Sequence, residues 1–271
     1  MFENINYPII DSHCHIYPEA ITGKAVEAIE NFYDNLYKGF DGTTDTMLEN
    51  AEKSGVVHHV VFSVATTPRQ VNSINRFISD AVKNSNGVFT GLGTLHPYSE
   101  TLSEDFEELI SLGLKGVKLH PDFQKIPLDD ECCMKIYKLC SGKIPVLLHT
   151  GDHRFDYSNP DRMKKVLERF PDCIFIGAHF GGWSVWDEAV AELSSYENFY
   201  VDTSSSLSDI STETATRLIE AYTPDRVLFG TDYPLGDSCK ETDLLKKAVT
   251  DAESLEKIFH LNAEKLFEIR L

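Results

Sequence analysis

The chain has 271 residues, of which 25 are Lys or Arg and 43 are Asp or Glu, so its formal net charge is −18. Nucleic acids and anionic membranes are bound through clustered cations, and this acidic balance therefore argues against either as a partner. With 42% hydrophobic and 11% aromatic residues, the chain can fill a core, which excludes a disordered acidic tail. The length fits one α/β barrel of about 250 residues, so we expect a single domain over residues 1–271.

Cysteine spacing and the amino-terminal residues predict a cytoplasmic protein. No pair among the six cysteines has the C-x-x-C spacing of a zinc or redox motif. Residues 1–10 lack the basic and apolar stretches of a secretory leader. No apolar run approaches the roughly 20 residues of a membrane helix. A small molecule is therefore the expected partner, with no nucleic acid and no membrane.

Eight short apolar runs alternate with longer amphipathic segments. Uninterrupted apolar runs are typical of parallel strands buried on both faces. The predicted strands are 7–11, 56–64, 88–95, 114–119, 144–148, 173–178, 199–203 and 226–230. Segments with helix-capping residues are 43–55, 103–113, 129–142, 159–170, 184–195 and 211–222. This alternation predicts an α/β fold, a (β/α)8 TIM barrel; an open doubly wound sheet is the alternative, but it should not give eight such evenly distributed units.

Two further segments are predicted to close the barrel. Residues 17–42 are too long for a simple loop, and we expect a helix over 20–36 that covers the mouth, the barrel end at which the strands' carboxyl ends lie. This segment, 17–42, is called the lid below. Residues 254–271 are predicted to be helical throughout and to pack against the outside of the barrel.

The predicted strand ends carry ionisable side chains. His13 and His15 are two residues apart at the end of the first strand, so both project to the same side. His149, His179 and Asp232 each follow a later apolar run. Any one of them alone would be an ordinary polar residue, but a closed barrel would bring all five together at its mouth. Nitrogen and oxygen ligands of this kind suit zinc, or another divalent first-row metal.

The fourth predicted strand adds Lys118 and His120, again two residues apart. A cation beside a metal pocket would bind a carboxylate or another anionic group of a substrate, whereas the alternative is a lysine held in the barrel by an ion pair. We interpret five other histidines as structural or surface residues: His58, His59, His96, His153 and His260.

In this order, His13-x-His15, His149, His179 and Thr231-Asp-Tyr-Pro234 resemble the amidohydrolase superfamily. The match is to its amidohydrolase-2 branch, which includes aminocarboxymuconate semialdehyde decarboxylase. The carboxyl-terminal Asn262-Ala-Glu-Lys-Leu-Phe267 resembles a tail common there, so the resemblance spans the whole chain. It implies metal-dependent chemistry in a TIM barrel; dimers occur in the branch, but no interface signature is found here.

The resemblance also implies roles for individual residues. One Zn²⁺, or another divalent metal, would be held by His13, His15, His149 and Asp232, and His179 would transfer protons together with Asp232. Lys118 also resembles a lysine that is carboxylated and bridges two metals in dihydroorotase-like members, in which case His149 and His179 would bind a second ion. We favour one metal.

Three functions are compatible with these residues. The favoured one is a hydrolase that uses metal-activated water on a lactone or amide that can carry a carboxylate. The alternative is a non-oxidative decarboxylase of an unsaturated or aromatic acid, and the third is a catalytically silent metal-binding protein, against which the complete ligand set argues. Trp183 and Trp186 are expected either to contact the substrate or to pack the following helix.

Overall fold

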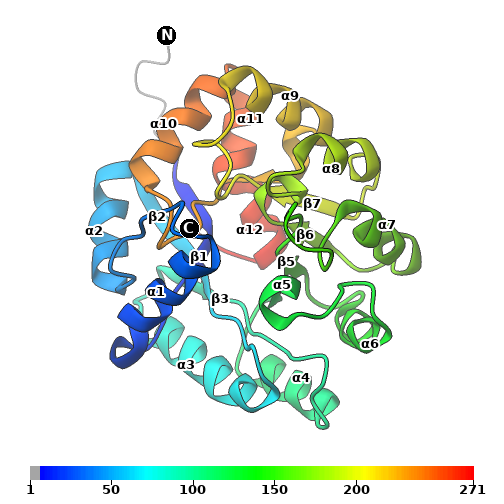
Figure 1. Cartoon of the computed structure of the whole chain (residues 1–271). Coiled ribbons are helices and arrows are strands. Elements are labelled where there is room, and N and C mark those ends of the chain that lie inside the picture. The colour runs from blue at the N-terminus through cyan, green and yellow to red at the C-terminus, as the bar shows by residue number, and fades with distance from the viewer. Residues whose placement is uncertain (1–6) are drawn as a thin grey trace.

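The computed structural model describes residues 7–271, so the first six residues of the amino-terminal stretch considered above lie outside it. The described residues form a (β/α)8 barrel, as predicted (Figure 1). Its strands are β1 (Ile9–His15), β2 (Val56–Phe62), β3 (Phe89–Gly91), β4 (Val117–Leu119), β5 (Val146–Leu148), β6 (Phe175–Gly177), β7 (Phe199–Asp202) and β8 (Val227–Leu228). Each one overlaps one of the eight predicted runs.

The helices lie around these strands, most of them in an outer ring (Figure 1). They are α1 (Thr22–Phe32), α2 (Thr44–Ser54), α3 (Val71–Asn84), α4 (Leu102–Ser111), α5 (Pro121–Gln124), α6 (Glu131–Cys140), α7 (Pro160–Arg169), α8 (Trp186–Leu193), α9 (Thr212–Tyr222), α10 (Ser238–Ala248), α11 (Ala252–Glu256) and α12 (Asn262–Phe267). The six predicted segments match α2, α4 and α6 to α9. Thr43 caps α2 and Gly55 ends it at a φ of 81°, where a residue without a Cβ is favoured.

The strands close into a barrel through two narrow joins. Strands β1 to β3 and strands β4 to β8 form two runs of parallel neighbours. The amide of Lys118 donates to the carbonyl of Gly93 (2.7 Å), which joins β4 to the chain after β3. The amide of Asp232 donates to the carbonyl of His13 (2.9 Å), which joins the chain after β8 to β1. The second join therefore places two predicted site residues side by side.

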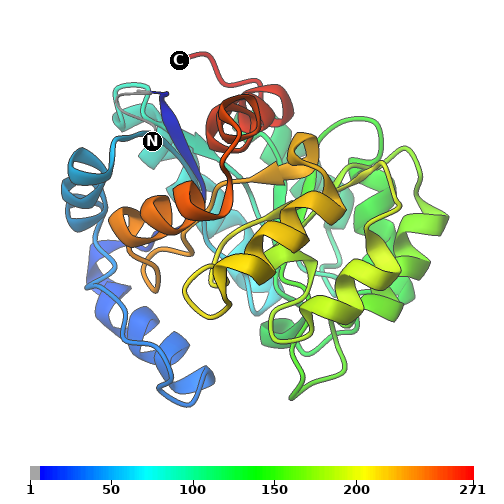
Figure 2. The ribbon, with the colours of Figure 1, turned by 90° about the horizontal axis from the view of Figure 1, so that it is seen from above.

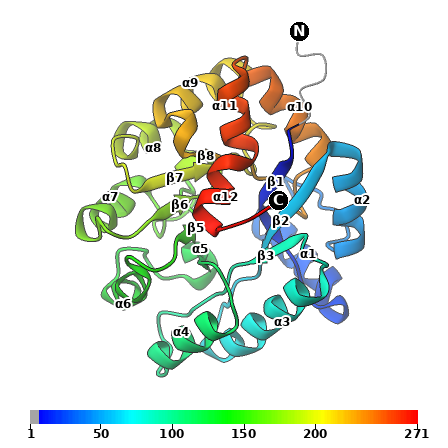
Figure 3. The ribbon, with the colours of Figure 1, turned by 180° about the vertical axis from the view of Figure 1, so that it is seen from behind.

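The carboxyl-terminal helix plugs one end of the barrel. Ala263, Phe267 and Ile269 are buried against the side chains that fill the barrel interior, among them Ile10 and Leu147. Figure 3 shows α12 lying across the barrel end behind the strands. The expectation that 254–271 packs on the outside of the barrel holds for its first part, because Leu255 and Phe259 join the outer layer of the core. It is wrong for α12 and the residues after it, whose apolar side chains complete the interior core at the barrel end.

That carboxyl-terminal segment is also not helical throughout, contrary to prediction. It contains α11, a π-helical turn at Lys257–Leu261 and α12, which ends where Glu268 takes a left-handed conformation (φ 56°). Residues 269–271 continue without helical structure.

The lid contains the predicted helix, shortened to α1 and preceded by a turn of 3-10 helix at Glu19–Ile21. Figure 2 shows α1 and the carboxyl-terminal helix at opposite ends of the barrel. Ile29 of α1 and Tyr33 after it are buried and face the strands' carboxyl ends. No helix among residues 7–271 combines the length and the apolar character that a membrane crossing needs.

Candidate metal centre

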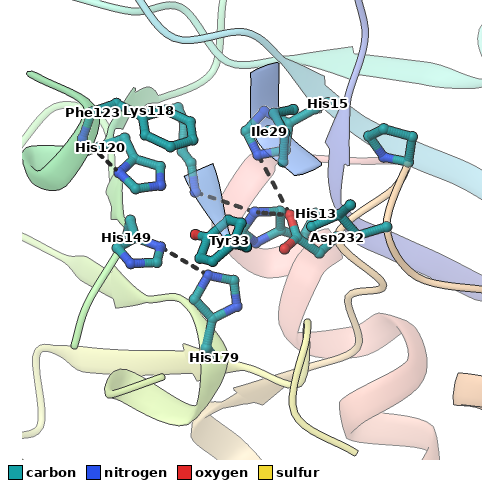
Figure 4. Close-up of a pocket in the computed structure, with 12 residues that line it drawn as sticks. His13, His15, Ile29, Tyr33, Lys118, His120, Phe123, His149, His179 and Asp232 are labelled. Carbon is teal, nitrogen blue, oxygen red and sulfur yellow. Dashed lines mark hydrogen bonds and ion pairs between the residues drawn. The ribbon is translucent and has the colours of Figure 1, made fainter. Parts of the chain in front are cut away.

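Two histidines and one aspartate meet at the mouth of the barrel (Figure 4). Asp232 Oδ1 lies 3.2 Å from His13 Nε2 and 3.5 Å from His15 Nε2. All three side chains are buried, and their ligand atoms form one compact group. Burial opposes the ionisation of Asp232, but the histidines around it hold the pKa of this carboxyl well below its usual range. The group therefore pairs a carboxylate with two imidazole nitrogens, as the strand-end pattern predicts.

Asp232 is held in place from two directions. Asp11 of β1 accepts hydrogen bonds from the Thr231 amide (3.0 Å) and hydroxyl (2.6 Å), which fastens the loop after β8 to β1. The Ser205 hydroxyl donates to Asp232 Oδ2 (2.6 Å). Because Oδ2 is occupied in this way, Oδ1 is the oxygen left facing the two imidazoles.

The spacing of these atoms fits a divalent metal. Tetrahedral zinc with bonds of 2.0–2.1 Å places neighbouring ligand atoms about 3.3 Å apart. The contacts of Asp232 Oδ1 with the two imidazoles, at 3.2 and 3.5 Å, bracket that value. The donor set of two nitrogens and a carboxylate oxygen also suits manganese or iron.

His149 and His179 lie on the opposite side of the cavity. His149 Nδ1 is 3.0 Å from His179 Nε2, and burial lowers the pKa of both rings, that of His179 to about 4. His149 Nε2 is buried without a hydrogen-bond partner and lies 3.6 Å from Asp122 Oδ2. An orphaned buried imidazole nitrogen is the kind of atom that a metal or a rotation of the ring would satisfy. That His149 is the fourth ligand stays a prediction, as does the number of metals.

Lys118 is a buried cation beside this group. Its ammonium lies 3.2 Å from His13 Nε2 and 5.0 Å from the centre of the Phe62 ring, and only 1% of the residue is exposed. Burial lowers the pKa of Lys118 to about 8, although Asp202 and Asp232 oppose this shift. Lys118 is the one lysine among the residues that line the cavity, and no arginine lines it. Its ammonium contacts a predicted metal ligand, and that Lys118 binds the substrate stays a prediction.

His120 presents one edge to the same cavity. Its ring stacks between Phe123, with centroids 3.6 Å apart, and His149, at 3.9 Å. His120 Nδ1 accepts a hydrogen bond from the Phe123 amide (3.3 Å), so the proton of the neutral ring sits on Nε2. Burial lowers the pKa of His120 well below its usual range, which keeps the ring neutral. His120 is therefore a hydrogen-bond donor suited to a substrate oxygen.

Sequence reasoning missed Asp202, the last residue of β7. Asp202 is fully buried, and its Oδ2 accepts a hydrogen bond from His13 Nδ1 (2.8 Å). The signal was present in the sequence, because Asp202 directly follows the apolar Phe199–Val201 in the same way that the other site residues follow their strands.

The cavity is small and roofed by the lid. It encloses about 10 Å³ of free volume, room for about one water molecule. Ile29, Tyr33 and Leu235 line it on the side of the lid. A substrate larger than water must therefore displace lid side chains to enter.

The two tryptophans pack around the cavity rather than line it. The Trp186 indole N–H donates to the His179 carbonyl (3.1 Å), and the Trp183 ring packs against Tyr33 with centroids 5.2 Å apart. Neither is among the residues that line the cavity, which favours their packing interpretation.

Arg154 joins the lid to the loop after β5. Its guanidinium makes two hydrogen bonds to the buried Asp152 carboxylate, at 2.9 and 2.7 Å, and donates to the Phe32 carbonyl at the end of α1 (2.8 Å). The rings of Phe32, Tyr33 and Trp183 surround it at 5.1–5.3 Å. Arg154 therefore holds the closed lid in place.

Similar folds occur among solved structures. An uncharacterised TIM-barrel protein from Bordetella bronchiseptica is 22% identical with a TM-score of 0.81, over 96% of this chain and 98% of that one. The 5-carboxyvanillate decarboxylase from Sphingomonas paucimobilis is 15% identical with a TM-score of 0.74, over 97% and 100%. A manganese-bound dihydroxybenzoic acid decarboxylase from Polaromonas sp. JS666 is 16% identical with a TM-score of 0.73, over 98% of each chain. At these identities the likeness concerns the fold.

No curated protein sequence matches the chain. The family model described as Amidohydrolase matches residues 10–269, which is nearly the whole chain. That span contains the H-x-H pair, the later histidines and the Asp232 loop whose geometry is described above. The chain therefore belongs to the amidohydrolase family, in the metal-dependent branch that its motifs indicate.

Proposed function

We propose that this protein is a metal-dependent decarboxylase that removes CO₂ from a small aromatic or unsaturated acid without oxidation. The observation that carries the proposal is the buried ammonium of Lys118. It lies beside the group formed by His13, His15 and Asp232, in a cavity whose other walls include Phe123 and Tyr33. A single cation in a cavity with aromatic walls suits a flat molecule with one carboxylate.

The comparisons favour this function over the hydrolase that the sequence favoured. Two of the similar solved structures are, by their names, decarboxylases of 5-carboxyvanillate and of dihydroxybenzoic acid, and one of them contains manganese. Their low identity makes this support one of fold and family. The metal of this chain is accordingly proposed as Zn²⁺ or Mn²⁺.

His13, His15, His149 and Asp232 would hold the metal. When bound, it would act as a Lewis acid that polarises a substrate oxygen and withdraws electron density from the reacting carbon. Lys118 would pair with the substrate carboxylate, and the Nε2–H of His120 would donate to an oxygen of the same molecule. Because the lid covers the cavity, these electrostatic contacts would be stronger than in an open site.

His179 is proposed to deliver the proton that replaces the carboxylate. The bond between the ring carbon and the carboxylate carbon breaks, its electron pair stays on the ring carbon, and CO₂ leaves. The same carbon takes a proton from His179 Nε2, and solvent returns one to the imidazole when the lid opens. An anionic substrate would favour the protonated imidazole, because a nearby negative charge raises a histidine pKa. Asp232 would keep its carboxylate beside the reacting centre.

Hydrolysis of a lactone or amide is the second candidate. It is favoured by the free volume beside His179 and Asp232, which is about that of one water molecule. The same two side chains would then take a proton from that water and return it to the leaving group.

The experiment that separates the two supplies the zinc- or manganese-loaded chain with hydroxylated benzoates, unsaturated acids, lactones and amides. We expect CO₂ release from at least one acid, and at least a 100-fold lower kcat/KM for the Lys118→Met variant on that acid. The Lys164→Met variant is the control, because Lys164 lies half-exposed on α7 and pairs with Glu192, away from the residues that line the cavity. Release of acid from a lactone or amide without CO₂ from any acid would establish the hydrolase instead.

A further inference from the structure

One buried carboxylate contacts two of the histidines that line the cavity, His13 through its ring and His179 through its backbone amide. Asp202 Oδ2 accepts from His13 Nδ1 at 2.8 Å. Its Oδ1 accepts from the backbone amides of His179 (3.0 Å) and Ser204 (3.1 Å). Asp202 itself is fully buried and is not among the residues that line the cavity. Any effect it has on the reaction must therefore pass through its neighbours.

Asp202 determines which nitrogen of His13 faces the cavity. An ionised carboxylate can only accept a hydrogen bond, so His13 Nδ1 carries the proton. The lone pair of the neutral ring is then on Nε2, the atom beside Asp232 Oδ1 and the Lys118 ammonium. An ammonium can only donate, so the contact between Lys118 and Nε2 agrees with this assignment.

The same carboxylate sets the position of His179. His179 has a left-handed backbone (φ 60°), which a residue other than glycine adopts only when its surroundings hold it there. The bond from its amide to Asp202 provides such a restraint. His179 Nδ1 lies 3.0 Å from the Ser204 carbonyl, which can only accept, so Nδ1 carries the proton of the neutral ring and Nε2 faces the cavity. Asp202 fixes this carbonyl too, because it binds the amide and hydroxyl of Ser204.

We propose that Asp202 is a positioning residue that fixes the tautomer of His13 and the placement of His179, so that both rings present Nε2 to the metal and substrate. This inference rests on the proposed metal-dependent function. In general, a carboxylate that accepts a hydrogen bond from a metal-bound histidine orients the ring and raises its affinity for the metal. The inference assigns this role to Asp202, acting through His13. Asp202 is not a catalytic residue, because it does not line the cavity.

The first test needs neither metal nor substrate. Long-range ¹H–¹⁵N correlation spectra of the metal-free protein, labelled at histidine, report the tautomer of each ring at a pH where it is neutral. The His13 signals are assigned by their loss in the His13→Gln variant. We expect the Nδ1–H tautomer for His13. An Nε2–H tautomer would overturn the inference, whatever reaction the protein catalyses.

The second test replaces Asp202 with asparagine, which keeps its size. If the amide oxygen still accepts from the two backbone amides, the amide N–H₂ faces His13 Nδ1 and moves the ring proton to Nε2. We expect the Asp202→Asn variant to show this tautomer and to bind zinc about 10- to 100-fold more weakly in a competition with a chelating dye.

Asp152→Asn is the matched control. Asp152 is an equally buried aspartate at the same end of the barrel, but its partner is Arg154 rather than a histidine of the cavity. We expect its zinc affinity and its His13 tautomer to be those of the unmodified protein. Equal losses of zinc affinity in both variants would show that Asp202 acts only on stability, and unchanged zinc affinity in Asp202→Asn would overturn the inference. If Asp202→Asn fails to fold, the His13 tautomer measured in the unmodified protein still tests the inference.

Discussion

Both ends of the barrel are closed by a helix, but with opposite chemistry. At the bottom, α12 buries apolar side chains such as Ala263 and Phe267 against the apolar interior of the barrel. At the mouth, the lid covers imidazoles, carboxylates and an ammonium that are all buried. Burial of apolar area stabilises a fold, whereas burial of charged groups costs stability unless they are paired. The residues at the bottom therefore stabilise the barrel, whereas the buried polar groups at the mouth lower its stability and are explained by the chemistry of the site.

The difference explains why the two closures are held differently. The bottom closure is continuous with the core and has no reason to open. The lid is held by a few specific contacts, of which the Arg154 guanidinium makes several. A few discrete contacts can be broken and remade during turnover, which a substrate larger than the cavity requires. The two ends should accordingly respond to substitution in separable ways.

The largest expected effect is on activity, from Asp232→Asn at the mouth. Asparagine removes the negative charge that faces His13 and His15, so we expect at least a 1,000-fold loss of turnover, about 4 kcal/mol in the activation free energy. Metal retention should fall in parallel, as measured by elemental analysis after dialysis. Asp237→Asn is the control, because Asp237 caps α10 in the same loop and asparagine caps helices equally well. Full activity in Asp232→Asn would remove this residue from the site.

The next effect is on stability, from Phe267→Ala at the bottom. Phe267 is fully buried among the residues that fill the barrel, and removal of such a ring should cost about 3–4 kcal/mol in the free energy of unfolding. Denaturant unfolding measures this loss, and zinc affinity below the transition should be unchanged. The exposed Leu271→Ala variant should show neither effect. If Phe267→Ala lost metal affinity to the same extent as stability, the two ends of the barrel would not respond independently to substitution.

The barrel was predictable from the sequence because its determinants are local. Each strand is a short apolar run, and the ends of helices such as α2 are marked by capping residues, here Thr43 and Gly55. The carboxyl-terminal segment was misplaced for the opposite reason. Its amphipathic pattern shows that one face is buried, but not which part of the barrel buries it.

The site was predictable where a strand end positions a side chain directly, as with His13 and Lys118. Asp202 carried the same signal but was overlooked, because a single aspartate after an apolar run is ambiguous until its partner is known. Arg154 carried no signal at all. Its role depends on a carbonyl of the lid and on rings from the lid and from the loop after β6, which come together only in the folded chain.

A smaller effect tests the cost of buried charge at the mouth. Glu241, in the first turn of α10, is buried, and burial raises its pKa to about 7 from 4.5. The folded state therefore binds more protons than the unfolded state between these values, and stability should fall as pH rises from about 5 to about 7.

Glu241→Gln removes this titration, because glutamine stays neutral. Relative to the unmodified protein it should gain about 3 kcal/mol at pH 8 and much less at pH 5, since the shift from 4.5 to about 7 corresponds to about 1.4 kcal/mol for each pKa unit. Urea unfolding at the two pH values measures the difference. The control is Glu220→Gln, at an exposed position of α9, which should change the free energy of unfolding little. A gain in Glu241→Gln that does not depend on pH would mean that this carboxylate carries no burial cost.

The smallest effect should come from Arg154→Lys in the loop that holds the lid. Lysine keeps the charge but loses the planar fork that binds Asp152 through two nitrogens while reaching the Phe32 carbonyl. The closed lid should be weakened by about 1 kcal/mol, the scale of one hydrogen bond, and KM should rise about fivefold with a small change in kcat. Arg169→Lys, whose guanidinium pairs with Glu131 on the outer helices, should leave both constants unchanged. Arg154 lies at the mouth but touches neither the predicted metal ligands nor Lys118, so we expect it to act on lid closure alone. A fall in kcat with KM unchanged would mean that Arg154 acts on the chemical step. Lid closure and catalysis would then not be separate.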